Sequence, residues 1–553
     1  MRTLSTQSPL LAQALQLFSK GAYPQAIVLL QKAAATQPLQ LEPRLQLAKA
    51  CLDWVQIQAQ TPLTEVEPDA LGDEGRHYLQ LAQSQMQALE KSHPASPHVQ
   101  SLLAMVHLVF SRYDDALRCL RKALTKDMRN PDVLYNMGYA LMELERYAEA
   151  ATQFTRLTAL HPRHGMGWQM LGQARLLVGD PAAAVLAYQK AKNLLPDWYQ
   201  PYGGLASALC DLGRYAEAKE VLRQGLEGHP SSWDMNIKFA GLSLSTEDWE
   251  TGWRYYACRP SSTRRLPFPE GYAIPLGPGQ LVKIRYDQGL GDELFFLRFV
   301  PGLVAQGMTI HYTAHRKLFP LLQGKTDIVE LSAAEPGQTV QHDVLVGDLP
   351  YLAGMRSTND IPPPLTLPLD QAKVELLRKQ LTAFGPPPYL GVTWMGGTPK
   401  KPGSKGVWRI LHKDIPAALL GKLAHDWPGT VVVLQRVPKL EDLANFSTAL
   451  GRPYLDWSGL NDDLRDALAG LSLLDDYVGV SNTNMHLLAG LGKTARVLVP
   501  HPAEWRWMAS GDESPWFPGF RIYRQSIDHA WDDALGRLAQ DVAEKYQSRG
   551  KRQ

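Results

Sequence analysis

The chain has 553 residues, of which 20% are charged, and its formal net charge at pH 7 is +2. This length predicts two to four domains, because one hydrophobic core rarely serves more than about 300 residues. The near balance of charge argues against a protein that binds the phosphate backbone of nucleic acids, and no apolar run has the length of a membrane span.

The first residues, "MRTLSTQSPLLAQALQLFSKG", make a poor signal peptide because Gln and Lys interrupt their apolar residues at helical spacing. The cysteines are Cys51, Cys119, Cys210 and Cys258, and no two of them form a CxxC pair. Scattered thiols fit a reducing compartment better than a disulfide framework or a zinc site. We therefore expect a cytoplasmic protein.

A repeat with a period of 34 residues runs through the first half of the chain. Small residues mark the period at Ala82, Ala116, Ala150, Ala184, Ala218 and Gly252. Four of them are followed, twelve residues later, by Pro94, Pro162, Pro196 and Pro230. Small residues let the two helices of a hairpin pack closely, and a proline ends the second helix.

This pattern resembles the tetratricopeptide repeat (TPR) over roughly residues 8 to 259. The stretch Thr61–Gly75 lengthens the second repeat, and we expect it to form a loop between the helices of that repeat. The resemblance implies an α-solenoid whose concave surface binds an extended peptide or a partner protein. The alternative is that the repeats only stabilise the second half of the chain or make it a homo-oligomer.

Strands and helices alternate after the repeats, beyond a connector rich in proline and glycine (Pro267–Gly279). The β-type runs are "LVKIRYD", "MTIHYTA", "HDVLVGD", "YLGVTWM", "TVVVLQ", "DYVGVSN" and "ARVLVP". They fall into two groups, separated by "DIPPPLTLPLD" and "GPPPY". This order predicts two parallel α/β lobes that face each other across a cleft. We place the repeat domain at residues 1–259 and the two lobes at 270–385 and 386–553.

The first lobe begins with a glycine turn in "KIRYDQGLGDELFFLRFVP" (Lys283–Pro301). Gly289 and Gly291 are spaced like the first glycines of a dinucleotide fingerprint, but Leu294 stands at the third position. No acid follows in 309–314, where that fingerprint would carry one. The turn therefore favours a bend that presents Asp292, with Glu293 as the less favoured substitute. The alternative is that Asp292 only caps the helix that it begins.

Polar residues also follow three strands of the second lobe. A loop rich in glycine and lysine occupies Gly391–Arg409, Gln435 and Arg436 end another strand, and Asn482, Thr483 and Asn484 open a helix that carries His486. Backbone N–H groups at such ends and nearby cations suit a diphosphate. The alternatives are simple helix caps, a packed core histidine and a solvated lysine loop at 400–405.

These motifs, in this order and spacing, resemble the C-terminal catalytic region of bacterial TPR glycosyltransferases, from about Trp253 to Gln525. That family is heptosyltransferase-like (glycosyltransferase family 9-like) and is distantly similar to protein O-GlcNAc transferases. The resemblance implies a GT-B fold with two Rossmann-like lobes. It places the donor nucleotide in the C-terminal lobe and the acceptor nearer the N-terminal lobe. It implies neither a metal nor a cofactor besides the nucleotide-sugar.

The resemblance also assigns roles to single residues. Asp292 falls on the catalytic base, and His486 is the second catalytic candidate. The donor-binding positions are Gly289, Gly291, Thr393, Gly396, Gly397, Lys405, Gln435, Asn482, Thr483 and Asn484. Ser481 departs from the pattern, because many relatives have aspartate there. We expect the aromatic residues Trp505, Trp507, Trp516 and Phe517 to pack the last strand and helix rather than to stack on a base.

We therefore expect a glycosyltransferase that moves a sugar from a nucleotide-sugar to an acceptor. A protein acceptor held by the repeats, such as a flagellin or a surface protein, is favoured. One alternative is a non-catalytic TPR scaffold that binds nucleotide-sugar. The other is an enzyme that acts on a glycolipid or lipopolysaccharide, which would not need so many helical hairpins.

Overall fold

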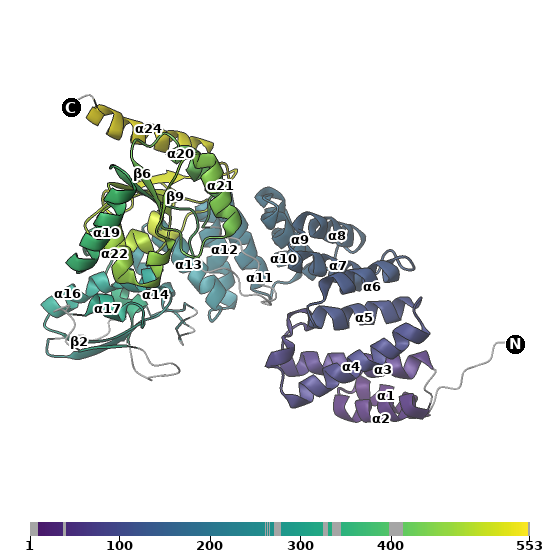
Figure 1. Ribbon diagram of the computed structural model, residues 1–553. Coiled ribbons are helices and arrows are strands. Elements are labelled where there is room, and N and C mark those ends of the chain that lie inside the picture. Colours follow the sequence, from purple (N-terminus) through teal and green to yellow (C-terminus); the bar gives the residue numbers. More distant parts are fainter. Residues whose placement is uncertain are drawn as a thin grey trace. The chain divides into compact units, whose positions relative to one another are not determined.

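The computed structural model describes residues 9–36, 40–259, 261–262, 264, 266–269, 278–323, 330–333, 344–397 and 413–550 (Figure 1). The chain forms two compact units. The first contains the described residues up to Ala208, and the second contains the described residues from Leu209 onward. No helix within these described ranges is long and apolar enough to cross a membrane.

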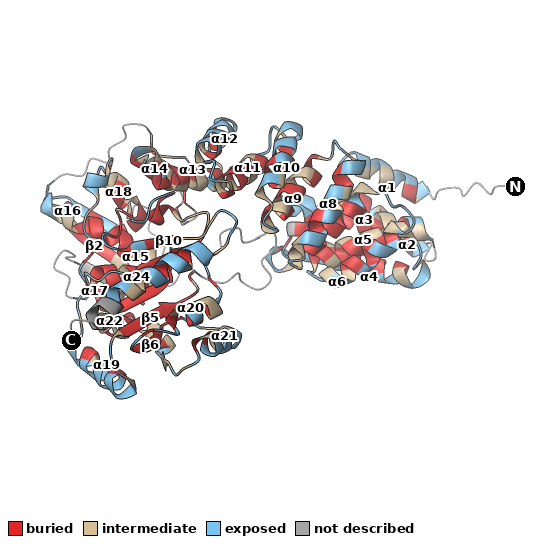
Figure 2. Cartoon of the chain, turned by 90° about the horizontal axis from the view of Figure 1, so that it is seen from above, coloured by how far each residue is buried: buried red, intermediate tan, exposed pale blue. Residues whose placement is uncertain are grey.

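Helical hairpins make up the first unit. Its helices are α1 (Pro9–Ser19), α2 (Tyr23–Thr36), α3 (Leu41–Ala59), α4 (Asp73–Ser92), α5 (Pro97–Val109), α6 (Tyr113–Leu124), α7 (Pro131–Glu143), α8 (Tyr147–Leu160), α9 (Gly165–Leu177) and α10 (Pro181–Leu194). Helix α11 (Gln200–Asp211) continues into the second unit, which also contains α12 (Tyr215–Gly228), α13 (Trp233–Ser245) and α14 (Trp249–Tyr256). Figure 2 shows the buried residues along the facing sides of these helices. This confirms the predicted α-solenoid.

The residues that mark the period are the ones that bring the helices together. The five alanines of the period are fully buried, and Gly252 is buried as well. Two further glycines make room for aromatic rings. A Cβ atom on Gly138 would lie 2.5 Å from the ring of Phe154, and one on Gly172 would lie 2.8 Å from the ring of Tyr188. Helices α4, α8, α10 and α12 each end two residues before the predicted proline stop.

Residues 61–72 of the insertion lie between α3 and α4, as predicted, and contain two short 3-10 helices, η1 (Leu63–Glu65) and η2 (Pro68–Ala70), whereas residues 73–75 already form the start of α4. Leu63 and Val66 are buried. The hydroxyl of Tyr139 on α7 donates a hydrogen bond to the carbonyl oxygen of Thr64, 3.0 Å away. The insertion is therefore packed against the repeats that follow it.

Two parallel sheets organise the second unit. The first has the order β3-β2-β1-β4, and the second has the order β10-β9-β8-β5-β6-β7. Their strands are β1 (Leu281–Arg285), β2 (Thr309–Ala314), β3 (Glu330–Ala333), β4 (Val344–Leu345), β5 (Tyr389–Thr393), β6 (Thr430–Val433), β7 (Leu455–Asp456), β8 (Asp476–Val480), β9 (Arg496–Val499) and β10 (Arg521–Arg524). Each of the seven predicted runs contains one of these strands. The three strands that were not predicted, β3, β7 and β10, are all at sheet edges.

Helices flank these strands in the sequence. They are α15 (Leu290–Phe296), α16 (Val300–Ala305), α17 (Phe319–Leu322), α18 (Leu349–Leu352), α19 (Gln371–Phe384), α20 (Ala417–Ala424), α21 (Leu440–Leu450), α22 (Leu464–Ser472), α23 (Thr483–Gly490) and α24 (Asp532–Gly550). The short 3-10 helices are η3 (Leu297–Phe299), η4 (Val346–Asp348), η5 (Thr358–Asp360), η6 (Ser458–Asp462) and η7 (Trp505–Trp507). Every residue of β5, β6, β8 and β9 is buried, as expected for parallel strands covered on both faces.

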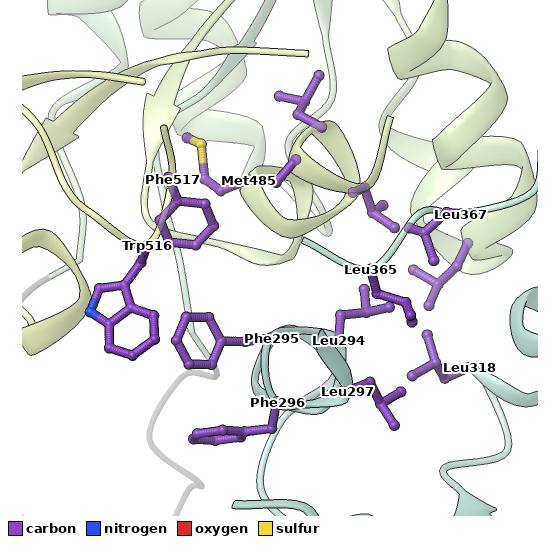
Figure 3. Close-up of a cluster of buried hydrophobic side chains, with 14 of the residues drawn as sticks. Leu294, Phe295, Phe296, Leu297, Leu318, Leu365, Leu367, Met485, Trp516 and Phe517 are labelled. Carbon is purple, nitrogen blue, oxygen red and sulfur yellow. The ribbon is translucent and has the colours of Figure 1, made fainter. Parts of the chain in front are cut away.

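One aromatic core joins segments that are far apart in the sequence. Figure 3 shows Phe295 of α15 beside Trp516 and Phe517, and the centres of the Phe295 and Trp516 rings are 4.9 Å apart. Trp253 of α14 packs edge-to-face on Trp505 at 5.4 Å and on Trp516 at 5.8 Å. The four predicted packing aromatics are all buried, but they share a core cluster with α14 and α15, whereas the last helix, α24, belongs to another cluster. The last repeat helix, α14, therefore shares its core with the α/β part of the second unit.

Candidate functional site

A pocket of about 370 Å³ lies in the second unit where strands of both sheets end. The turn after β1 contributes to its wall, and so do the segments that follow β5, β6 and β8. Eleven of the predicted site residues line it: Gly289, Gly291, Asp292, Thr393, Gly396, Gly397, Gln435, Asn482, Thr483, Asn484 and His486. Lys405 lies outside the described residues. The carboxyl ends of parallel strands are where such folds place their ligands.

The turn before α23 is held by a hydrogen-bond network around Tyr477 of β8. The Tyr477 hydroxyl lies 2.8 Å from Thr393 Oγ1 and accepts from the side-chain amide of Asn484 at 3.1 Å. Asn482 donates to Thr393 Oγ1 at 2.9 Å, and its Oδ1 accepts from the Asn484 backbone N–H at 3.0 Å. Thr393 and Asn484 are therefore bonded inward and shape the turn. Sequence reasoning missed Tyr477, because it looks like one more apolar residue of a buried strand.

The loop after β5 is held by Gln435. Its Oε1 accepts from the backbone N–H groups of Trp394 and Met395, both at 2.9 Å, and its amide donates to the carbonyl of Met395 at 3.3 Å. Gly396 touches the end of β8 so closely that a Cβ atom would lie 2.2 Å from the Ser481 carbonyl oxygen. Both residues thus fix the shape of the pocket wall.

His486 of α23 lies against the glycine turn that follows β1. A Cβ atom on Gly291 would lie 2.9 Å from its ring, so the missing side chain of this glycine makes the contact possible. The imidazole packs edge-to-face on Phe517, with ring centres 5.3 Å apart. Burial, reinforced by Arg506, lowers the pKa of His486 well below its usual value. The ring is therefore neutral at pH 7, and it both packs in the core and lines the pocket.

Asp292 is the third residue of α15, and both of its carboxylate oxygens are engaged. Oδ2 accepts a hydrogen bond from the backbone N–H of Gly289 at 3.1 Å, which is a helix-capping contact. Oδ1 forms an ion pair with Arg506. The side chain keeps 26% of its surface exposed and lines the pocket. Asp292 thus caps the helix and also presents a carboxylate to the pocket.

A cluster of charges that sequence reasoning missed completes the pocket. Arg506 bridges Asp292 and Glu504. Glu504 Oε2 accepts from the Lys413 ammonium at 2.6 Å and from the Ser481 hydroxyl at 3.1 Å. Burial by itself would raise the pKa of Glu504, but Lys413 and Arg506 hold it well below its usual range. The sequence signal that could have predicted this buried ion pair is the presence of two charged residues, Glu504 and Arg506, among the aromatic residues of "EWRWM".

Aromatic rings fix the position of the Arg506 cation. Its guanidinium carbon lies 4.3 Å from the centre of the Trp505 ring and 4.7 Å from that of Phe295. Such contacts stabilise a cation that has little water around it. The described pocket therefore combines two fixed cations, Lys413 and Arg506, with the two carboxylates that pair with them and with the N-terminus of α23, which adds partial positive charge. Among the described residues, no group of three or more His, Cys, Asp and Glu side chains could hold a metal ion.

Glu293, the substitute considered for Asp292, lies outside the residues that line this pocket. It is 1% exposed, and it accepts hydrogen bonds from the Tyr312 hydroxyl at 2.5 Å and from the His315 backbone N–H at 3.0 Å. Asp292 and Glu293 are neighbours on α15, but Asp292 lines the pocket whereas the Glu293 side chain is buried in the core. Glu293 therefore holds α15 to the end of β2.

Replacement of Glu293 by glutamine should change how stability depends on pH. Burial raises the pKa of Glu293 from 4.5 to about 7, so between these values the folded state binds more protons than the unfolded state. The free energy of unfolding therefore falls as pH rises through this window. Glu293→Gln keeps an acceptor for Tyr312 but has no carboxyl group to titrate. Between pH 5 and pH 8, the free energy of unfolding of the unaltered protein should therefore fall by about 2–3 kcal/mol more than that of Glu293→Gln. Urea unfolding at several pH values measures this, and parallel pH profiles would contradict it.

Comparisons with known proteins agree with the repeat pattern. Two tetratricopeptide-repeat family models match residues 135–197 and 199–227. Residues 135–227 therefore contain tetratricopeptide repeats. Protein FlbA of Caulobacter vibrioides is 26% identical over 446 residues, which cover 73% of this chain and 71% of FlbA. The human protein O-mannosyl-transferase TMTC1 is 24% identical over 184 residues, 32% of this chain, and the chain spans only 18% of that protein.

Solved structures show similarity to parts of the chain. PilF of Pseudomonas aeruginosa has a TM-score of 0.32 and 22% identity, with 39% of this chain and 91% of PilF covered. A tetratricopeptide repeat protein of Parabacteroides merdae has a TM-score of 0.34 and 14% identity, with 46% of this chain and 92% of that protein covered.

Proposed function

We propose that the chain is a glycosyltransferase with a GT-B fold that moves a sugar from a nucleotide-sugar to a protein bound by the repeats. The observation that carries this proposal is the pocket at the ends of two parallel sheets, where fixed cations and a carboxylate meet. We assign residues 1–259 to the repeat domain, 270–385 to the acceptor-side lobe and 386–553 to the donor-side lobe. The similarity to FlbA, which covers most of both chains, and the name of TMTC1 are consistent with it.

The donor diphosphate would lie against the N-terminus of α23 and accept hydrogen bonds from Lys413 and Arg506. Negative charge on the leaving nucleotide grows as the bond to the sugar breaks, so groups that stabilise this charge lower the barrier. Lys413, Arg506 and the N-terminus of α23 supply positive charge there without rearrangement, because Glu504 and the surrounding rings already hold both side chains. In this proposal they do the work that a metal ion does in other transferases.

The acceptor hydroxyl needs a base on the opposite wall. Asp292 is the carboxylate that the first lobe presents to the pocket, and Arg506 fixes its position. A carboxylate within hydrogen-bond reach of the hydroxyl takes up its proton as the new bond forms. Both oxygens of Asp292 retain lone pairs beyond the contacts with Gly289 and Arg506, so it can still accept a hydrogen bond from the acceptor.

The first unit offers a place for a protein acceptor. A groove of about 790 Å³ is lined by residues of α3, α5 and α7, together with the start of the insertion. Its walls mix apolar side chains such as Leu102 and Met105 with polar ones such as Asp53, Lys126 and Asn136. A mixed groove of this kind suits an extended peptide, whose backbone and side chains need both types of partner.

Removal of the Lys413 charge should weaken the binding of nucleoside diphosphates. Lys413→Met deletes a cation of the proposed phosphate site and should raise the Kd for UDP, GDP or ADP at least about tenfold, the scale of one charge-assisted hydrogen bond. Isothermal titration measures this effect. Lys373→Met is the matched control, because Lys373 pairs with Asp466 on α22 and does not line the pocket. Equal affinities for the two variants would contradict the assignment.

Replacement of His486 tests a second side chain of the proposed phosphate site, besides Lys413. His486→Leu should weaken nucleotide binding or lower turnover by about tenfold, because a neutral imidazole donates one hydrogen bond to a charged oxygen. His486→Gln, whose amide can reach into the pocket, should keep more of the function than His486→Leu. If both variants fold and bind like the unaltered protein, the ring only packs against Phe517.

The proposed function is tested by a donor panel. Thermal unfolding with UDP-, GDP-, ADP- and CMP-sugars should reveal one nucleotide class that raises the melting temperature, because a ligand that binds only the folded state stabilises it. The same class should then give transfer of sugar to protein. Binding without transfer or donor hydrolysis would identify a non-catalytic scaffold, and transfer only to glycolipid would exclude the protein acceptor.

A further inference from the structure

The turn that presents Asp292 has an unusual backbone one residue before its first glycine. Gln288 has a φ angle of +60°, in the left-handed region that residues with side chains seldom adopt. Such a conformation persists where surrounding contacts hold it in place. The segment Asp287–Asp292 therefore needs partners outside its own loop.

The first partner is Arg259, which follows the end of the last repeat helix, α14. Its side chain is 1% exposed and forms ion pairs with Asp287 and, at 2.6 Å, with Asp348. Asp287 is also buried, and it accepts a hydrogen bond from the Ser261 hydroxyl at 3.0 Å. The guanidinium lies against Gly347 so closely that a Cβ atom there would be 2.7 Å from its Nε. The start of the turn is thus tied to a buried arginine at the end of the solenoid.

The second partner is Tyr256, the last residue of α14. Its hydroxyl lies 3.0 Å from the amide oxygen of Gln288 and 2.9 Å from the amide nitrogen. The tyrosine ring is held by Trp253, with ring centres 5.6 Å apart, and by the Arg259 guanidinium, 5.4 Å from the ring centre. Tyr256 thus bonds to the one residue of the turn that carries the left-handed backbone.

We infer that the last repeat helix positions the reactive turn, and that Tyr256 and Arg259 are positioning residues for Asp292. The role of Asp292 as a base rests on the proposed transferase activity. The role of Tyr256 and Arg259 in holding the turn does not depend on that activity. The far side of Asp292 is held by Arg506 from the other lobe. The carboxylate is therefore fixed between an arginine of the donor-side lobe and a turn that the solenoid supports.

If Tyr256 and Arg259 only stabilised the core, their replacement would loosen the whole second unit and not the turn alone. Tyr256→Phe separates the two cases, since it keeps the ring between Trp253 and Arg259 and removes only the hydroxyl bonded to Gln288. The neighbouring Tyr255→Phe removes a hydroxyl from the same helix and keeps the ring that packs on Phe239, so it is the matched control. Arg259→Lys keeps the charge and removes the two-pronged contact with Asp287 and Asp348.

The test is hydrogen exchange of the full-length protein, measured by mass spectrometry with and without UDP, GDP and ADP. In Tyr256→Phe and Arg259→Lys, amides of residues 287–292 should exchange about tenfold faster, the effect of one lost hydrogen bond. Exchange in residues 476–490 and the affinity for the nucleotide should match those of Tyr255→Phe. The turnover number for sugar transfer should fall by a similar factor while the KM for the donor stays constant.

Unchanged exchange at 287–292, or an equal rise at 287–292 and at 476–490, would overturn the inference. The exchange measurement needs no activity. Absence of transfer by the unaltered protein would therefore contradict the proposed function only. Hydrogen exchange alone would then decide whether Tyr256 and Arg259 hold the turn.

Discussion

Removal of residues 1–199 should abolish sugar transfer to the natural acceptor and leave nucleotide binding intact. The groove of the first unit lies within the deleted part, whereas every residue that lines the pocket of the candidate site lies in the second unit. The cut before α11 keeps α11 to α14, which the second unit needs. The carbonyl of Asp211 accepts from His501 at 2.8 Å, and that of Ser245 accepts from the backbone N–H of Ala509 at 2.9 Å.

The measurement is transfer of labelled sugar to acceptor protein, beside titration of the same truncated protein with the nucleotide. Retained nucleotide affinity is the control that shows the second unit is folded. Full transfer by the truncated protein would show that the repeats in α1–α10 do not recognise the acceptor, and that they serve another role, such as dimerisation.

Replacement of Asp292 by asparagine should lower sugar transfer about a hundredfold while the donor Kd changes little. Asparagine keeps the size of the side chain and an oxygen that can cap α15, but it cannot take a proton from the acceptor hydroxyl. A hundredfold loss is at the lower end of what general bases contribute. Steady-state transfer rates at saturating donor measure the effect.

Asp360→Asn is the matched control for the capping role of Asp292. Asp360 caps the short helix η5 through the backbone N–H of Ser357, at 2.8 Å, and does not line the pocket. Asparagine can still accept the capping hydrogen bond, so Asp360→Asn should change stability little and leave sugar transfer unchanged. If Asp292→Asn behaves like Asp360→Asn in both stability and transfer, Asp292 only caps its helix.

The periodic parts of the fold were predictable because each is encoded by neighbouring residues. Buried alanines every 34 residues specify the hairpins, and the central strands read as apolar runs because both faces of each sheet are covered. The missed strands lie at sheet edges. The strand "RIYR" carries two arginines and the strand "LD" has only two residues, so neither has the apolar run that reveals a central strand.

The candidate site was predictable where it follows strand ends, and it was missed where it depends on tertiary contacts. Gly289, Gly396 and His486 each follow a recognisable strand, so the parallel arrangement brings them to one pocket. Arg506, in contrast, reaches Asp292 from 214 positions further along the chain. No local pattern encodes that pairing. The opposite orientations of Asp292 and Glu293 were also hidden, because they depend on how α15 packs against β2.

The proposed transferase activity is tested most directly by release of nucleoside diphosphate from UDP-, GDP- and ADP-sugars, measured with extract proteins as acceptors. The unaltered protein should release nucleotide from one donor class and attach the sugar to protein. Asp292→Asn should do so about a hundredfold more slowly, and Lys413→Met should need a higher donor concentration. Failure of every donor in the panel to bind to the unaltered protein, or equal rates of nucleotide release by all three proteins, would contradict the proposed transferase activity.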